Sequence, residues 1–238
     1  TQLLAPALEG LSKFAHLINF DTVVDLLKVL KGLLKNVHVL PLDASLNCVL
    51  TAFQTLQGPG RELQIDQKEY VNPLYNQLPR LATTTEDNIH TTQLALKCLY
   101  VAFIKRKEYS TIRVAAFIKQ LCTVSLHAPP HTSAPLLAFT RQLLQRYPAT
   151  LQLIENEQDV IASGTYSPHV EDSEHSNPFA TSAWELGNLK FGLDAKVVGH
   201  ALGAATGKML ALPVEEPGRI CAEMGRDWED GYIAHRVG

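Results

Sequence analysis

The densest group of potential metal ligands in the chain lies in one short acidic stretch. Two imidazoles and three carboxylates occur within seven positions, at His169, Glu171, Asp172, Glu174 and His175. Such side chains bind divalent cations, so a metal-dependent enzyme is one hypothesis. The spacing matches neither an EF-hand nor a zinc pattern, and an acidic loop that is hydrated or meets a basic partner is the more ordinary interpretation. We expect neither a metal nor a cofactor here.

A second stretch looks like a phosphate-binding loop but departs from that motif. Residues 203–209 read GAATGKM, with one residue too few between the glycines and Met209 in place of the Ser or Thr that would hold magnesium. We expect instead a helix face of small residues, where Gly199, Gly203 and Gly207 let another backbone approach closely. The chain has no GxSxG and no CxxC motif, so the sequence predicts no catalytic residue.

Basic residues gather between positions 97 and 119, where Glu108 is the single acid. Contacts with phosphates would make binding depend steeply on salt. A solvated helix face is the alternative, since the helix dipole favours cations such as Lys105 near a C-terminus. The candidate basic contact surface consists of Lys97, Lys105, Arg106, Lys107, Arg113 and Lys119.

The composition is that of a globular chain. Its 238 residues carry a formal net charge of −3, and 46% are hydrophobic, which provides material for a core and no overall attraction to nucleic acid. The four cysteines show no paired spacing, as expected in a reducing compartment. We find no signal peptide and no apolar run of about 20 residues. The chain starts at Thr1, and we expect it to be part of a longer protein.

Helical periodicity dominates the chain. Apolar residues recur at helical spacing, as Leu26, Leu30 and Leu33 do, and no hairpin dipeptide joins two alternating runs. Asp21 and Asp43 are predicted to be N-caps. The expected helices cover about residues 6–18, 21–34, 43–57, 66–81, 86–107, 114–124, 132–147, 184–189 and 194–206.

The helices occur in pairs with a roughly even period. The pairs start near Pro6, Asp43, Glu86 and Thr132, at intervals of 37, 43 and 46 residues. HEAT and armadillo arrays repeat at about 40–47 residues, and their stacked pairs bury apolar stripes without a central pocket. We therefore predict an all-α solenoid of HEAT/armadillo-like helix pairs, with a closed bundle as the alternative.

The periodic pattern breaks in an acidic connection. Residues 148–179 span 32 positions, and connections of this length are commonly functional. Pro168 and Pro178 forbid a continuous helix there. We therefore expect a helical-repeat region at residues 1–147 and a C-terminal region at residues 148–238, with the acidic extended segment at 148–179 before its helices, packed as one continuous solenoid.

A helix beginning with Trp184, Glu185 and Leu186 is expected to follow this connection, with Thr181 or Ser182 as its N-cap. The ordinary role of Trp184 is to pack the last helices together in the core. Residues 166–177 are expected to lie extended on a helical surface, of this chain or of a partner. The predicted partner-binding residues are Tyr166, Pro168, Val170, Glu171, Asp172, Glu174, Asn177, Trp184, Glu185 and Leu186.

This part of the chain also carries a recognisable motif. It consists of Tyr166, Pro168, Asp172, Glu174, Ser176-Asn177 and Trp184-Glu185-Leu186 with Leu189. The motif resembles the signature of the CCAAT-binding-factor (CBF) domain family of nucleolar ribosome-assembly proteins. Residues 8–19, 25–30 and 116–123 are similar to one member of that family, so the resemblance covers about residues 3–190. After Lys190 the chain departs from the family, which commonly has a His-Tyr-His-Pro run where residues 191–194 read FGLD.

The resemblance implies a helical-repeat scaffold without enzymatic activity. It implies a role in assembling the large (60S) ribosomal subunit, as a heterodimer with a sister member of the family. The pair would accompany pre-60S particles from the nucleolus to the nucleoplasm, with pre-60S proteins and rRNA as contacts. A link to the initiation of DNA replication has also been attached to this family member. A generic HEAT-like adaptor in transport or chromatin is the alternative function.

Overall fold

The computed structural model of the chain is built from helices. It describes residues 6–8, 10–11, 20–35, 40–57, 68–83, 88–105, 109–155, 163–206 and 217–224. Within these ranges every regular element is a helix or a helical turn, so the predicted all-α class is confirmed. The labelled helices are α2 (Phe20–Leu34), α3 (Leu42–Gln57), α4 (Lys68–Gln77), α5 (Arg80–Thr83), α6 (Asn88–Leu99), α7 (Thr111–His127), α8 (Pro130–Arg146), α9 (Gln152–Glu155), α10 (Trp184–Leu189) and α11 (Ala195–Ala205).

Shorter helical pieces complete the described chain. A π-helical turn, Tyr100–Ile104, continues α6, and another helix covers residues 217–224. Three 3₁₀ turns lie at Pro148–Leu151, Ser173–Ser176 and Pro178–Ala180.

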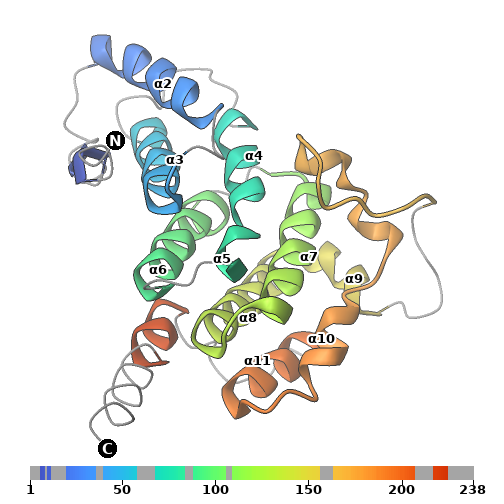
Figure 1. Ribbon diagram of the computed structural model, residues 1–238. Helices are drawn as coiled ribbons and strands as arrows, with labels where there is room; N and C mark the ends of the chain where they lie inside the picture. The colour runs from blue at the N-terminus through green and yellow to red at the C-terminus, as the bar shows by residue number, and fades with distance from the viewer. Residues whose placement is uncertain are drawn as a thin grey trace, which may run out of the picture.

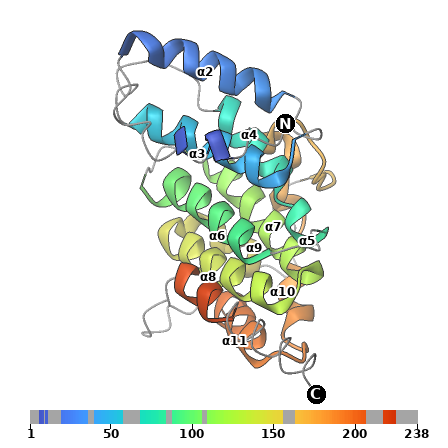
Figure 2. The same cartoon turned by 60° about the vertical axis from the view of Figure 1, so that its left-hand side comes forward.

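The helices are stacked on one another in a regular order. Helix α3 packs against α2, α4 and α6, and α8 packs against α6, α7 and α11. Figure 2 shows α2, α3, α6, α8 and α11 following one another down the molecule. Each helix buries its apolar stripe mainly on its neighbours, as in a solenoid. The pairing of helices into HEAT-type repeats stays a prediction.

Helix α7 is buried along most of its length. Residues 113–122 of this helix are all buried, because α8, α10 and the turns after residue 147 cover it (Figure 1). Its Phe117 ring lies edge-on to two other aromatic rings, with centroid distances of 5.2 Å to Tyr75 and 4.7 Å to Phe103. These rings join α4, the π-helical turn after α6 and α7 into one core.

The chain turns sharply between α7 and α8 because of two prolines. Ser110 caps the start of α7 by accepting a hydrogen bond from the Arg113 backbone N–H. The helix ends at His127, beyond the expected end near residue 124, and Pro129 and Pro130 lie at the start of the next helix. Because a proline at the first helical position sacrifices no helix hydrogen bond, α8 starts at once at Pro130.

Several predicted caps are wrong. Asp21 and Asp43 lie inside α2 and α3 rather than before them, and the Asp43 carboxylate instead accepts a hydrogen bond from the Thr91 hydroxyl at 2.6 Å. Neither Thr181 nor Ser182 caps α10, since Ala183 occupies the N-cap position and makes no side-chain bond. The predicted helix starting near residue 66 begins outside the described residues.

The predicted extended connection at residues 148–179 is only partly extended. Its first part forms a 3₁₀ turn and helix α9, and its last part holds two further 3₁₀ turns. Among the described residues of this connection, residues 163–172 and Asn177 lie outside helical turns.

We expect Phe117→Ala to lower the free energy of unfolding by about 3–5 kcal/mol, because it leaves a cavity between three packed helices. The Phe117 side chain is fully buried, whereas Phe191 is 88% exposed. Phe191→Ala is therefore the matched control, with a change within about 0.5 kcal/mol. Urea unfolding of both variants measures the difference, and equal losses would contradict this account of the core.

Candidate functional site

The acidic segment, defined here as residues 163–183, folds back onto helices α4 and α7. Figure 1 shows it in orange beside these two helices. Its ends are tied together, since Ser167 N donates to Ser176 O at 2.9 Å and Asn177 Nδ2 donates to Ser163 O at 3.0 Å. Two positive φ angles, 107° at Gly164 and 52° at Asn177, make this closure possible.

Arg113 is the cation around which the first half of the acidic segment is arranged. Its side chain projects from α7, is 4% exposed, and places Nη2 3.4 Å from Asp172 Oδ1 and 3.3 Å from Glu174 Oε2. Glu174 also pairs with Lys68 of α4 at 3.2 Å and accepts a hydrogen bond from the Ser110 hydroxyl at 2.5 Å. Two acids therefore link the segment to both helices.

Polar contacts next to Arg113 fix the local turn. The Asp172 carboxylate caps the 3₁₀ turn Ser173–Ser176 by accepting a hydrogen bond from Glu174 N. Asn72 of α4 accepts hydrogen bonds from the Ser173 backbone N–H at 3.3 Å and hydroxyl at 3.1 Å. Asp172 thus serves both as a helix cap and as an ion-pair partner.

The carboxyl groups in this region are stabilised in their charged form. Partial burial alone would raise the pKa of Asp172, but the Glu174 N–H and the Arg113 guanidinium lower it more, so its pKa lies below the ordinary value of 3.8. The hydrogen bond from Ser110 is the main cause that lowers the pKa of Glu174 below 4.5, with Lys68 and Arg113 adding to it.

A buried ion pair attaches the end of the acidic segment and the start of α10 to α7. Lys119 of α7 and Glu185 of α10 are both nearly inaccessible, and their Nζ and Oε2 atoms lie 2.6 Å apart. Lys119 Nζ also donates to the Ser182 carbonyl at 2.6 Å, while Thr123 donates to the other Glu185 oxygen at 2.9 Å. Three polar contacts therefore surround charges that burial would otherwise disfavour strongly.

Two aromatic rings complete the surroundings of the Lys119 ammonium. Its Nζ atom lies 5.7 Å from the ring centroid of Tyr166 and 5.2 Å from that of Trp184, within the range of cation–π attraction. Trp184 is 51% exposed, so the prediction that it packs in the core between the last helices is wrong. The indole instead covers a buried cation and leaves part of its surface to solvent.

Tyr166 anchors the start of the acidic segment. Its hydroxyl lies 3.4 Å from the Tyr75 hydroxyl and 3.4 Å from Gln120 Oε1. Burial is the main cause that raises the pKa of both tyrosines, so both phenols are neutral at physiological pH and act as hydrogen-bonding groups only.

The six residues of the candidate basic surface do not form one surface. Arg113 and Lys119 are buried, so their prediction as exposed contact residues is wrong, and the acids they bind belong to this chain. Lys97 and Lys105 are exposed. Arg106 and Lys107 lie outside the described residues.

The ten predicted partner-binding residues divide in the same way. Glu171 is exposed and Trp184 is half-exposed, so these two remain available to a partner. The other eight are buried or partly buried, namely Tyr166, Pro168, Val170, Asp172, Glu174, Asn177, Glu185 and Leu186. Several of them are engaged within the chain, such as Asp172, Glu174 and Glu185. Binding of a partner by any of the ten stays a prediction.

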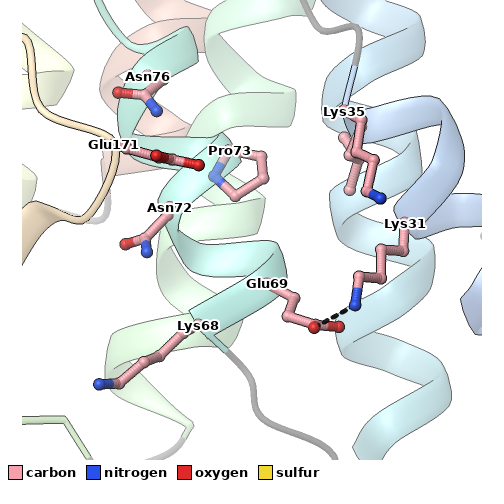
Figure 3. Close-up of a pocket in the computed structure, with 9 residues that line it drawn as sticks. Lys31, Lys35, Lys68, Glu69, Asn72, Pro73, Asn76 and Glu171 are labelled. Atoms are coloured by element: carbon pink, nitrogen blue, oxygen red, sulfur yellow. Dashed lines mark hydrogen bonds and ion pairs between the residues drawn. The ribbon is translucent and has the colours of Figure 1, made fainter.

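A polar groove of about 350 Å³ lies between α2 and α4. In Figure 3, Lys31 and Lys35 line one wall, Asn72 and Asn76 line the other, and Glu171 of the acidic segment reaches in beside them. Lys31 also forms an ion pair with Glu69. The groove is lined by Lys31, Leu34, Lys35, Lys68, Glu69, Asn72, Pro73, Asn76 and Glu171.

The other candidates for chemistry have structural surroundings. In the described part of the chain no three His, Cys, Asp or Glu side chains gather as a metal site would require. Gly203 of α11 faces the Arg141 side chain of α8, whereas nothing lies close to Gly199, so the predicted close backbone approach is wrong at both. Gly207 lies outside the described residues.

The cysteines lie in the core. All four, Cys48, Cys98, Cys122 and Cys221, are free and buried. Burial raises the pKa of each thiol, to about 12 for Cys48 and Cys221. None is therefore a thiolate at neutral pH, which excludes the usual form of cysteine nucleophile at these positions.

Sequence reasoning missed the α7 side of the site. The apolar positions of α7 cover most of its circumference, but Arg113, Gln120 and Thr123 recur at i, i+7 and i+10 on one face, beside Lys119. A polar stripe on a helix that is otherwise apolar all round indicates a buried polar interface. That signal, rather than the count of basic residues, identifies the helix that the acidic segment covers.

Comparison with known proteins identifies the family. The CBF/Mak21 family model matches residues 45–200, from α3 to α11, which is more than half of the chain. The chain belongs to the CBF/Mak21 family. The match contains the acidic segment with both of its ion-pair centres, so the structure described above is that of the family's own region.

Individual relatives support the same assignment. The Nucleolar complex protein 3 homolog of Mus musculus is 43% identical over 190 residues, covering 79% of this chain and 23% of the relative. That of Xenopus laevis is 38% identical over 226 residues, covering 94% and 27%. The Nucleolar complex-associated protein 3 of Schizosaccharomyces pombe is 30% identical over 223 residues, covering 79% and 30%.

Residues 8–19, 25–30 and 116–123 were predicted to resemble one member of the family, and these relatives carry the name of that member, so the prediction is confirmed. The chain spans about a quarter of the length of the relatives it matches. Among the described residues, no helix combines the length and apolar character of a membrane span.

We expect Lys119→Met to lower the free energy of unfolding by about 3–5 kcal/mol, because it leaves the Glu185 carboxylate buried without its cation. The double variant Lys119→Met/Glu185→Leu removes both charges and should recover much of that loss. Lys97→Met, at an exposed lysine, is the control, with a change within about 0.5 kcal/mol. Urea unfolding ranks the variants, and a double variant less stable than the single one would refute a dominant charge effect.

We also expect the attachment of the acidic segment to weaken in acid. The pKa values of Asp172 and Glu174 are depressed in the folded state, so their stabilising effect is present above the unfolded pKa values near 4 and is lost as the pH falls through the folded ones. In Asp172→Asn/Glu174→Gln this effect is absent. The difference in unfolding free energy between wild type and variant should shrink from pH 7 to pH 3, and a constant difference would contradict the assignment.

Proposed function

We propose that this chain is part of a non-catalytic assembly factor for the large ribosomal subunit, acting in the nucleolus and nucleoplasm. It would form one half of a heterodimer with a sister nucleolar complex protein and accompany pre-60S particles. The observation that carries the proposal is the CBF/Mak21 match over residues 45–200, together with relatives whose names contain the words nucleolar complex.

The chemistry of the described residues favours a scaffold. The thiols are buried with raised pKa values, and the carboxylates of Asp172, Glu174 and Glu185 are bonded to cations of the same chain. Charged groups that face each other inside a fold position elements and do not turn over a substrate. The stacked helices provide a long surface for binding other molecules, which is the usual task of solenoids.

Two exposed features are the best candidates for contact with the sister protein. Glu171 stands at the edge of the polar groove and the Trp184 ring is half-exposed, and half-exposed tryptophans are common at the centres of interfaces. The exposed Lys97 and Lys105 are available for rRNA. Direct rRNA contact would appear as binding that weakens steeply with salt.

Affinity purification of the tagged full-length protein from nuclear extract tests the function. We expect the sister family member and pre-60S particles among the bound proteins, and depletion of the protein should stall large-subunit maturation. Recovery of transport receptors in place of assembly factors would favour the alternative, a generic HEAT-like adaptor. Normal maturation after depletion would remove the proposed role.

We expect Glu171→Lys to weaken capture of the sister protein about tenfold or more, because a reversed charge at an interface costs over 1 kcal/mol. Its unfolding free energy should be nearly unchanged, since Glu171 is exposed. Asp25→Lys, an identical charge reversal at an exposed residue of α2, is the matched control. Pull-down with titrated partner measures both, and equal behaviour of the two variants would place the interface elsewhere.

A further inference from the structure

The hydroxyl of Ser110 occupies an unusual electrostatic position. Ser110 is exposed and lies at the N-cap of α7, where the helix dipole favours negative charge. Its hydroxyl donates to Glu174 Oε1 at 2.5 Å and accepts from Arg113 N at 3.3 Å. The same oxygen therefore touches the acidic segment and the start of the helix that the segment covers.

A second observation indicates unused capacity for an anion at this helix start. The Arg113 side chain is 4% exposed, and its Nε atom is buried without a hydrogen-bond partner. Only Nη2 of that guanidinium contacts Asp172 and Glu174. Guanidinium groups bind phosphate oxygens through two N–H groups at once, so Arg113 has a donor left for an additional anion.

The sequence before Ser110 is basic. Arg106 and Lys107 stand four and three positions ahead of it in the sequence KRKEYS. Kinases choose their substrates by such charge patterns. An exposed serine that follows basic residues at these distances fits a basophilic serine kinase.

We propose that Ser110 is a phosphorylation site and that its modification releases the acidic segment from α7. The kinase transfers the terminal phosphoryl group of a nucleoside triphosphate: a bond forms between Ser110 Oγ and phosphorus, and the bond from phosphorus to the bridging oxygen breaks. The nucleoside diphosphate leaves with that electron pair, and the hydroxyl proton passes to a base of the kinase.

The consequence follows from the charges around the new group. Phosphoserine carries a charge of about −1.5 to −2 and would lie beside the Glu174 carboxylate, which loses its hydrogen bond from Ser110. The phosphate uses the donor that Arg113 has left, and it stands beside the Asp172 and Glu174 carboxylates that contact Nη2 of the same guanidinium. Like charges side by side disfavour docking, so the new anion at the helix start repels the acidic segment.

Protein carrying phosphoserine encoded at position 110 of the full chain tests the release directly. Amide hydrogen exchange, followed by mass spectrometry, should accelerate about tenfold or more across residues 166–177, with α8 unchanged. Ser110→Ala loses the hydrogen bond without adding charge and should show a smaller effect. An unchanged rate at 166–177, or acceleration across the whole chain, would overturn the proposal.

Two further comparisons separate charge from structure. In Asp172→Asn/Glu174→Gln the phosphate has no carboxylates to repel, so phosphoserine at 110 should add little to that variant's own exchange rate. The proposal would be contradicted if phosphoserine accelerated exchange in the Asp172→Asn/Glu174→Gln variant as much as in wild type.

The unmodified full chain, incubated with ATP and the catalytic subunit of a basophilic kinase, should incorporate phosphate at Ser110. The variant Arg106→Ala/Lys107→Ala should incorporate less phosphate. The proposal would also be contradicted if the kinase placed no phosphate on Ser110.

Discussion

Arg113 and Lys119 are cations on a helix that the fold buries along nearly its whole length. A buried charge is strongly disfavoured unless an opposite charge and hydrogen bonds surround it. Their partners, Asp172, Glu174 and Glu185, all come from the chain that follows α9. Two charges on α7 therefore constrain the path of residues 163–190, and that path brings Glu171 to the groove and the Trp184 indole over the Lys119 ammonium.

The two ion-pair centres differ in how much water reaches them. Lys119 and Glu185 are almost fully enclosed, with Tyr166 and Trp184 facing the ammonium. The Arg113 centre is open on its acidic side, where Asp172, Glu174 and Lys68 retain contact with solvent. Salt screens the enclosed pair less than the open centre. The depressed pKa values of Asp172 and Glu174 make the attachment at the open centre sensitive to acid.

The sequence was a reliable guide to the periodic parts of this fold and a poor one to the polar contacts. Apolar spacing identified the all-α class, and the described regular elements are helices. The same spacing failed for Trp184, because an indole above a cation and an indole in a core occur at identical helical positions. It also treated Arg113 and Lys119 as surface residues. The polar stripe on α7 indicates a buried polar interface, but it does not show which residues, more than 50 positions away, pair with it. The family signature located the acidic segment but not the helix it covers.

The separation of these pairs along the chain has a consequence for synthesis on the ribosome. Lys119 and Glu185 are 66 positions apart, and Lys68 and Glu174 are 106 apart. Because translation adds about 5–20 residues per second, α7 emerges several seconds before the acids that neutralise it. During that interval its charged stripe keeps one side of an otherwise apolar helix hydrated. The charged side of α7 thus does not attract apolar partners until residues 163–190 arrive to cover it.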